Sequence, residues 1–162
     1  KTYRLGYSFF YRRAVNIMNI EYREFQGQQD WNWIQAQVGI KQCEDTNGIM
    51  AVDLNTNATV GACIMDNWTE NSVQCHFMVS TPMVLKYEFL ECCFNFIFNV
   101  ANVERVYGLV PANNKKAVKF NTRIGFTEKA CMEGAFSKGV DYLLMELKQE
   151  NCLHLPKHKK AA

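Results

Sequence analysis

The sequence predicts a mixed α/β fold, and three observations support this class. Short segments with the alternation of β-strands recur along the chain, and segments with helical spacing of apolar residues separate them. The composition, 48% hydrophobic and 21% charged, is that of a globular protein. A chain of 162 residues can bury a full core as one domain. We therefore expect a single domain over residues 19–152, with an extension or a first strand and helix over 1–18 and a basic tail over 153–162.

The first half of the chain predicts one helix among four strands. The helix is expected over 29–40, where Trp31, Ile34 and Val38 recur near the helical period. The turn residues "NTNA" separate the second strand from the third, which predicts a hairpin. The expected strands cover residues 19–25, 48–54, 59–67 and 72–80.

The second half predicts a helix, a strand, a short helix and a closing hairpin. Between residues 87 and 103 the polar residues fall three or four apart, which is typical of a helix with a narrow exposed stripe. Residues 105–110 form an apolar run typical of a central strand. Residues 127–136 and 140–147, separated by Ser-Lys-Gly, predict the antiparallel pair.

The stretch "VPANNKKAVKFNTRIGF", residues 110–126, predicts a strand end, a turn and the short helix. Either Asn113 or Asn114 can cap the helix N-terminus, which leaves the other asparagine free for a second role. Gly125 is expected to be the left-handed residue after the helix, with Phe126 as the accompanying apolar contact. The expected buried face of the helix consists of Ala117, Phe120 and Ile124.

The charges divide the chain into basic ends and an acidic middle. Residues 1–20 carry four basic residues and no acid, and residues 157–162 carry three basic residues. Of the 18 basic residues, 11 remain between these ends with all 16 acidic residues, so the middle has a net charge of −5. The basic ends fit either contact with a nucleic acid or the solubility of frayed termini. The acidic middle favours a cationic partner.

The cysteines and the apolar segments restrict the class of protein. Seven cysteines lack the paired C-x-x-C spacing of zinc sites, so we expect no metal and mostly buried, reduced thiols. No segment approaches the roughly 18 uninterrupted apolar residues of a membrane span. We therefore expect no membrane partner and a cytoplasmic location.

Together these residues resemble the GNAT superfamily of acyl-CoA-dependent N-acetyltransferases. The run "YEFLECCFNFIFNVANVERVYG" and the closing strand 139–145 resemble the branch that acetylates ribosomal-protein N-termini. The resemblance covers residues 72–148 well and residues 19–71 by element order. The most specific part is similar to the family signature N-x-x-A/S-x-x-φ-x-x-φ-G-F, where φ is apolar, carried here by Asn114, Ala117, Phe120, Ile124, Gly125 and Phe126.

The resemblance implies an architecture and a cofactor site. The expected fold is a central, mostly antiparallel sheet of six or seven strands with helices on both faces. In this family the fourth and fifth strands, here 73–80 and 105–110, splay apart, and the pantetheine arm of acetyl-CoA lies between them. The residues implied for cofactor binding are Met78, Val79, Ser80, Val84, Leu85, Lys86, Tyr87, Asn114, Ala117 and Phe120.

The loop that binds the diphosphate in this family, R/Q-x-x-G-x-G/A, is degenerate here. The matching residues 81–86 read Thr-Pro-Met-Val-Leu-Lys and lack both glycine-type positions. Glycine allows backbone amides to approach a diphosphate closely at a helix N-terminus. We expect Val84 and Lys86 to offer amides and Lys86 to add its charge, while the β-branched side chain of Val84 narrows the approach.

The proton-transfer groups of the family are only partly matched. His76 is the candidate proton acceptor, and strand alternation places it on the same face as Ser80. A structural strand histidine is the alternative, because the sequence gives His76 no partner. The two positions that often hold the acid for the departing thiolate are Asn121 and Ala117 here, and neither is an acid. The candidates to replace that acid are Tyr87, Ser80 and a water held by Asn114.

The resemblance implies an acetyl-CoA-dependent N-acetyltransferase, monomeric or homodimeric, that acts on a primary amine, with a protein N-terminus or lysine as the favoured acceptor. One alternative is a GNAT-fold binding protein that has lost catalysis, and another is an acetyltransferase that acts on aminoacyl-tRNA. Signature matching assigns the amide that faces the cofactor to Asn114 and leaves Asn113 to the turn. Five aromatic residues fit either an acceptor wall or core packing: Phe9, Phe10, Tyr11, Trp31 and Trp33.

Overall fold

The computed structural model describes residues 19–86 and 88–155, and its elements follow the predicted order. The predictions for residues 1–18, for Tyr87 and for the tail beyond residue 155 lie outside the described residues. The strands are β1 (Ile20–Glu24), β2 (Asn47–Asp53), β3 (Ala58–Asp66), β4 (Ser72–Val79), β5 (Arg105–Pro111), β6 (Thr127–Ser137) and β7 (Val140–Lys148). The helical elements are α1 (Gly27–Gln37), η1 (Pro82–Lys86), α2 (Phe89–Asn95), η2 (Phe96–Val100), α3 (Lys115–Arg123) and η3 (Gln149–Asn151).

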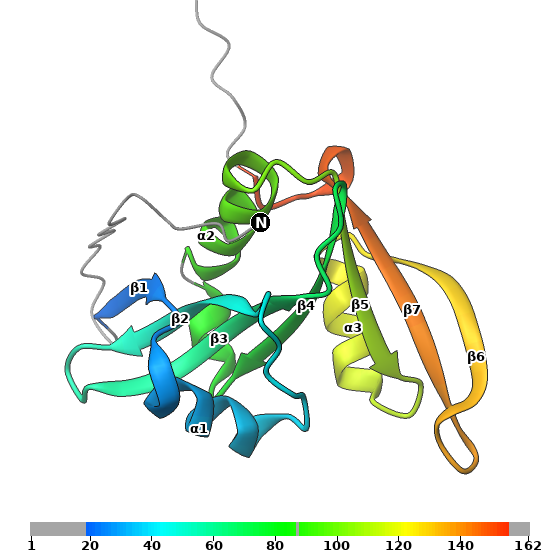
Figure 1. The fold of residues 1–162 in the computed structure, drawn as a ribbon, viewed down its shortest axis with the longest axis horizontal. Coiled ribbons are helices and arrows are strands. Elements are labelled where there is room, and N and C mark those ends of the chain that lie inside the picture. Colours follow the sequence, from blue (N-terminus) through cyan, green and yellow to red (C-terminus); the bar gives the residue numbers. More distant parts are fainter. Residues whose placement is uncertain (1–18, 87, 156–162) are drawn as a thin grey trace, which may run out of the picture. The chain divides into compact units, whose positions relative to one another are not determined.

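The strands form one seven-stranded sheet in the order β1-β2-β3-β4-β5-β7-β6 (Figure 1). Strands β1, β2 and β3 pair antiparallel in sequence, and β7 pairs antiparallel with both β5 and β6. The β4–β5 pair is parallel, with Ser72–Gln74 opposite Arg105–Tyr107. The predicted mixed α/β class with a mostly antiparallel sheet is therefore confirmed.

Contacts divide the described residues into two compact units. The first unit contains the residues up to Trp68 together with Cys75–Cys93, and the second contains Thr69–Gln74 and the residues from Phe94 onward. The boundary passes through β4, between Gln74 and Cys75, and through α2, between Cys93 and Phe94.

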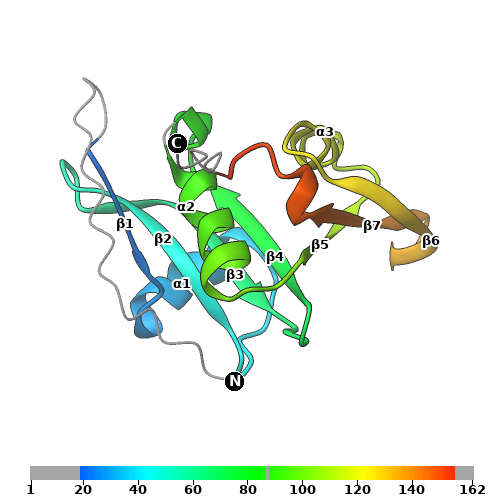
Figure 2. The ribbon, with the colours of Figure 1, turned by 90° about the horizontal axis from the view of Figure 1, so that it is seen from above.

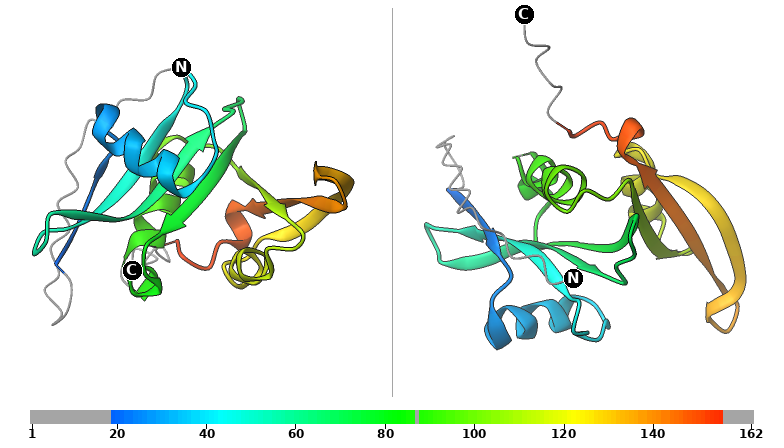
Figure 3. Two further views of the ribbon diagram at one scale, coloured as in Figure 1. Left: turned by 90° about the horizontal axis from the view of Figure 1, so that it is seen from below. Right: turned by 45° about the horizontal axis from the view of Figure 1, so that its top comes forward.

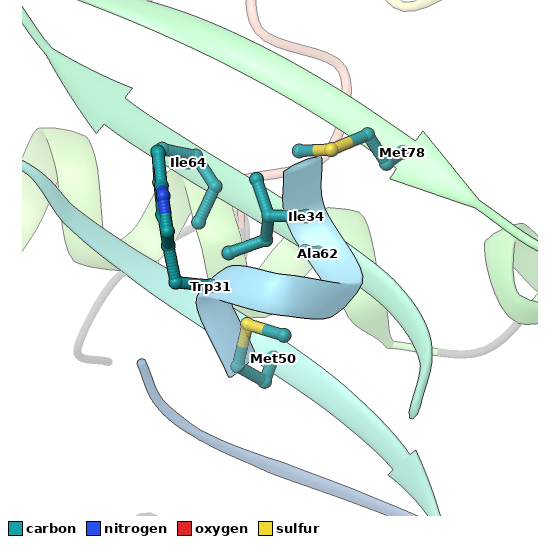
Figure 4. Packing of buried hydrophobic residues seen from close by; sticks show 6 residues of the cluster. All are labelled: Trp31, Ile34, Met50, Ala62, Ile64 and Met78. Carbon is teal, nitrogen blue, oxygen red and sulfur yellow. The ribbon is translucent and has the colours of Figure 1, made fainter. Parts of the chain in front are cut away.

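In the first unit, α1 lies on one face of the strands β1 to β4 and α2 begins on the other face (Figure 3). Trp31 and Ile34 are 3% and 0% exposed, as their helical spacing predicts. Burial of one such side chain contributes about 1.5–3 kcal/mol, so this packing fixes α1 on the sheet. Their partners on the strands are Met50, Ala62, Ile64 and Met78 (Figure 4).

A buried carboxylate anchors the start of α1 to β1. Arg23 donates from Nη1 and Nη2 to the two oxygens of Asp30, at 2.6 and 2.7 Å. The Gln26 N–H donates to Asp30 Oδ2 at 2.7 Å. Two-point bonds of this kind are stronger than neutral ones. The helix therefore begins at Gly27, two residues earlier than predicted, although Gln26 supplies no side-chain cap.

The helix predicted over residues 87–103 changes type along its length. It is an α-helix over Phe89–Asn95 and a π-helix over Phe96–Val100, where the Ala101 N–H donates to the Phe96 carbonyl at 2.8 Å. The three consecutive residues Phe96, Ile97 and Phe98 are all buried. A hydrophobic pattern read at the α-helical period does not show this change of type.

In the second unit, α3 lies on one face of β5, β7 and β6 (Figure 2). The end of α3 is a Schellman motif, in which the Phe126 N–H donates to the Asn121 carbonyl at 3.0 Å and the Gly125 N–H to the Thr122 carbonyl at 3.2 Å. Gly125 has a φ of 108°, in the left-handed region. The predicted end of this helix is therefore confirmed.

Candidate functional site

His76 of β4 and Asp66 at the end of β3 form a partly buried pair in the first unit. The His76 Nε2 lies 3.2 and 3.1 Å from the two carboxylate oxygens of Asp66. The side chains of His76 and Asp66 are 16% and 7% exposed. Strand alternation places His76 on the same face of β4 as Met78, which packs under α1. The candidate proton acceptor therefore has a carboxylate partner.

Ser80 follows β4 directly, and its hydroxyl proton is already used. Ser80 Oγ donates to the Val60 carbonyl oxygen at 3.1 Å, and the Ser80 N–H donates to the same oxygen at 2.9 Å. Both bonds hold the end of β4 to β3. Since a thiolate would have to compete with this carbonyl for the proton, the arrangement favours a structural role for the Ser80 hydroxyl.

The segment that replaces the diphosphate motif is the 3-10 turn η1. The Met83 N–H donates to Thr81 Oγ1 and the Val84 N–H donates to the Thr81 carbonyl, both at 3.3 Å. The Val84 amide that we expected to be offered to a diphosphate is thus bonded within the turn. The Lys86 side chain lies outside what the structure describes.

The Val84 side chain is fully buried in the first unit. It packs beside Gly61 of β3, where a Cβ would come within 3.2 Å of Val84 Cγ1. Glycine at this β3 position therefore leaves the room that the valine fills. The prediction that Val84 narrows the approach from solvent is wrong, because its side chain points into the core.

Asn114 is the N-cap of α3. Its Oδ1 accepts a hydrogen bond from the Ala117 N–H at 3.1 Å, which satisfies one of the free amides at the helix start. We predicted that Asn113 belongs to the turn at the helix start and that the Asn114 side chain faces a ligand. This prediction is wrong about the cap, because the Asn114 side chain is the one that caps the helix. Asn113 instead accepts a backbone bond from the Lys115 N–H at 3.0 Å.

The buried face of α3 differs in part from the prediction. Ile124 is buried as expected, but Asn121 is also buried, and its Nδ2 lies 3.8 Å from Met145 Sδ. Ala117 and Phe120 are only half-buried. The Asn121 amide lies beside Gly108 of β5, where a Cβ would be 3.6 Å from Nδ2, an ordinary contact distance. Ala117 and Phe120 consequently keep exposed surface for contact with a ligand.

The aromatic residues around α1 belong mostly to the core. Trp31 is almost fully buried, and its ring meets that of Phe25 edge to face at 6.1 Å. The alternative of core packing is thus the correct one for Trp31. Trp33 is partly buried beside the same cluster. The residues Phe9, Phe10 and Tyr11 fall in the part of the chain that is not described.

A second buried carboxylate, Glu146 of β7, lies in the second unit. It accepts hydrogen bonds from Arg105 Nη1 at 2.8 Å and Tyr107 Oη at 3.3 Å, and Lys129 Nζ lies 3.2 Å away. Burial acts to raise the pKa of Glu146, but the bonds from Arg105 and Lys129 outweigh it and lower the pKa below its usual value. Glu146 therefore stays ionised and links β5, β6 and β7 rather than acting as a proton acceptor.

The cysteines are free thiols, and three of them are buried in the first unit: Cys63, Cys75 and Cys93. Burial raises the pKa of Cys75 and Cys93 well above the usual value. Within residues 19–86 and 88–155, no group of three or more metal-binding side chains is arranged to hold an ion. The helices in these two ranges are all too short or too polar to cross a bilayer.

The candidate residues divide between the two units. The residues from His76 to Leu85 belong to the first unit, where Met78 is buried under α1 and Val79 and Leu85 are half-buried. Asn114, Ala117 and Phe120 belong to the second unit. Asp66 was not among the predicted site residues. Alternation places Asp66 on the same face of its strand as Ile64 and Ala62, and His76 on the same face as Met78, but only the structure shows that these two faces coincide.

Comparisons with known proteins identify the fold. No protein-family model matches the sequence, and no curated protein matches it. Solved structures of spermidine/spermine N-acetyltransferase SpeG from Vibrio cholerae do match. One, in complex with manganese ions, is 13% identical over 81% of this chain and 93% of that chain, with a TM-score of 0.67. The chain has the GNAT fold.

A second structure of the Vibrio cholerae enzyme, in complex with CoA and spermine, is 14% identical over 82% of this chain and 96% of that chain, with a TM-score of 0.62. The GNAT fold thus extends over about four fifths of the chain. The resemblance to the ribosomal-protein branch stays a prediction.

Proposed function

We propose that this GNAT-fold protein is an acetyl-CoA-dependent N-acetyltransferase that acts on a primary amine. The observation that carries the proposal is the structural similarity to N-acetyltransferases, one of which is in complex with CoA and an amine, spermine. Acetyl-CoA would supply an activated acetyl thioester. The residues of this chain have to bind the donor, orient the amine and take up its proton.

Each unit contains a region that we propose for contact with the donor, and each region is considered by itself. In the first unit it comprises the end of β4 and the turn η1, with the half-buried side chains of Val79 and Leu85 and the backbone of Met78. In the second unit it is the start of α3, where Ala117 and Phe120 keep exposed surface. The proposed cofactor-binding residues remain Met78, Val79, Ser80, Leu85, Lys86, Tyr87, Asn114, Ala117 and Phe120, whereas Val84 is left out because its side chain is buried and its amide is bonded to Thr81.

For the acceptor we propose a small cationic amine as the first class to test. The net charge of −5 between residues 21 and 156, from 11 basic and 16 acidic residues, favours attraction of a cation. The two solved structures compared above are named as spermidine/spermine and spermidine N-acetyltransferases. A protein N-terminus or lysine is the second class to test.

Binding of acetyl-CoA is the first test of the proposal. A ligand at 100 times its Kd stabilises a folded protein by about 2.7 kcal/mol, which is a rise in Tm of roughly 5–10 °C for a chain of this size. We expect this rise, together with heat of binding in calorimetry. Absence of both at millimolar acetyl-CoA would refute the proposal.

A matched pair of variants on α3 tests the placement of the donor. Ala117→Glu introduces a negative charge on the half-buried surface at the helix start, and should weaken acetyl-CoA binding at least about tenfold, since like charges repel in partly desolvated sites. Lys119→Glu changes the charge more but lies at an exposed position of the same helix, and should leave binding nearly unchanged. Equal effects of the two variants would argue against donor binding at this helix.

A second candidate function is a GNAT-fold protein that binds its ligand without catalysis. The degenerate turn η1 favours it, because the Val84 amide is bonded to Thr81 and no glycine is present between residues 81 and 86. It predicts binding of acetyl-CoA or of an amine without acetyl transfer. The two functions can be separated by incubating the protein and acetyl-CoA with a panel of polyamines and peptide N-termini and measuring the mass of each acceptor. Acetyl transfer increases the mass of the acceptor by about 42 Da, whereas binding alone leaves it unchanged.

A further inference from the structure

In the described part of the chain, the buried carboxylate of Asp66 is bonded to the imidazole of His76 and not to a lysine or arginine. Asp66 is nearly buried, and among the described ion pairs it has no lysine or arginine partner. A buried carboxylate needs hydrogen-bond donors to offset its lost hydration. These donors are Asn67 Nδ2 at 3.2 Å and the His76 Nε2 at 3.1 Å.

The geometry fixes the state of the imidazole ring. Because both Asp66 oxygens lie within hydrogen-bond distance of Nε2, the hydrogen of the neutral ring is held on Nε2 and the lone pair is left on Nδ1. The side chain of His76 is 16% exposed, so part of it reaches solvent. Nδ1 is therefore the ring nitrogen that can accept a proton.

We infer that Asp66 is a positioning residue for the proposed acetyl transfer, and that through this residue His76 Nδ1 is prepared to accept the proton of the acceptor amine. This inference rests on the proposed function. In the transfer, the amine nitrogen forms a bond to the acetyl carbon and the carbon–sulfur bond breaks. The proton lost by nitrogen goes to Nδ1, and the sulfur leaves as a thiolate that is protonated by water, to which His76 later returns its proton.

Steady-state kinetics of two variants test the inference in the full chain. His76→Gln should lower kcat by roughly 10²–10⁴-fold, the usual contribution of a positioned base, with KM for acetyl-CoA changed less than about twofold. Asp66→Asn should lower kcat by an intermediate factor, because the ring stays but loses its orientation. Added imidazole should restore part of kcat in His76→Gly and none in Asp66→Asn.

Two control variants make the same chemical changes elsewhere. Asp53→Asn alters a buried carboxylate that accepts from the Asn55 N–H at 3.0 Å in the β2–β3 turn. His154→Gln alters a histidine that stacks on Phe94 at 6.4 Å. Both should leave kcat within about twofold of the wild type, since neither contacts the proposed pair. Equal losses in the controls and in the test variants would overturn the inference.

Nitrogen NMR of the histidine side chains measures which ring nitrogen of His76 carries the hydrogen, and this measurement does not depend on turnover. In the wild type at neutral imidazole, His76 should show a protonated Nε2 and an unprotonated Nδ1, and Asp66→Asn should shift the ring toward a mixture of tautomers. If the wild type is active and His76→Gln has the same kcat, the inference is refuted while the proposed function stands. The pair would then only join β3 to β4. A wild type without turnover on any amine would refute the proposed function and the inference with it.

Discussion

At the residue scale, the two asparagines before α3 have different roles. Asn114 accepts the Ala117 N–H with its side chain at 3.1 Å, whereas Asn113 accepts the Lys115 N–H with its carbonyl. Asn114→Ala should therefore lower the free energy of unfolding by about 1 kcal/mol, as the loss of an N-cap does. Urea denaturation measures this change.

Two matched variants accompany this prediction. Asn114→Asp keeps an acceptor at the cap and should be close to neutral, and Asn113→Ala leaves the side-chain bond of the cap intact and should also change stability little. If Asn113→Ala destabilised the protein as much as Asn114→Ala, the assignment of the cap would be incorrect.

At the element scale, the junction of α3 and β6 depends on one glycine. Gly125 has a φ of 108°, and a Cβ there would lie 2.7 Å from the Asn151 carbonyl oxygen and 3.1 Å from Leu147 Cδ1. Gly125→Ala should cost about 1–3 kcal/mol of stability or more, because the strained backbone and the contact with backbone oxygen add to each other. The midpoint of urea denaturation should fall accordingly.

Gly139 in the β6–β7 turn provides the comparison for this prediction. It also has a positive φ, 76°, but a Cβ there would meet no atom within 4 Å. Gly139→Ala should therefore show the cost of the backbone conformation alone, about 1 kcal/mol. A loss at Gly139 as large as that at Gly125 would mean that the contact with η3 contributes nothing.

At the scale of the whole molecule, the reactivity of each cysteine thiol measures how accessible its surroundings are to solvent. Cys43 is exposed and should react first with a thiol reagent. Cys131 is also exposed, but desolvation and the nearby Asp141 raise its pKa, so it should react more slowly. The buried Cys63, Cys75 and Cys93 should react on the order of a hundredfold more slowly than Cys43, because they become accessible only when the first unit opens.

Time-resolved labelling followed by peptide mass spectrometry measures these rates, and unfolding in urea should make all seven sites equally accessible. Rapid labelling of the three buried thiols in the native protein would show that the core of the first unit opens easily.

The fold class and the order of the elements were determined by the sequence itself. Alternation located the strands and helical spacing located α1 and α3, because both patterns record which side of an element faces the core. Asn113 or Asn114 before α3 and Gly125 after it marked the helix ends, because capping hydrogen bonds join residues that are close in the sequence. The same local signals suggested the family to which the fold is similar.

Only the tertiary structure decided what the candidate side chains touch. The burial of Val84 depends on Gly61 of another strand, the pairing of His76 depends on Asp66, and the buried Asn121 amide contacts Met145 of β7. Such contacts join residues that are far apart in the sequence, so no local pattern specifies them. Local sequence therefore determined the elements and their ends, whereas long-range packing determined which polar groups are free for chemistry and which are already bonded.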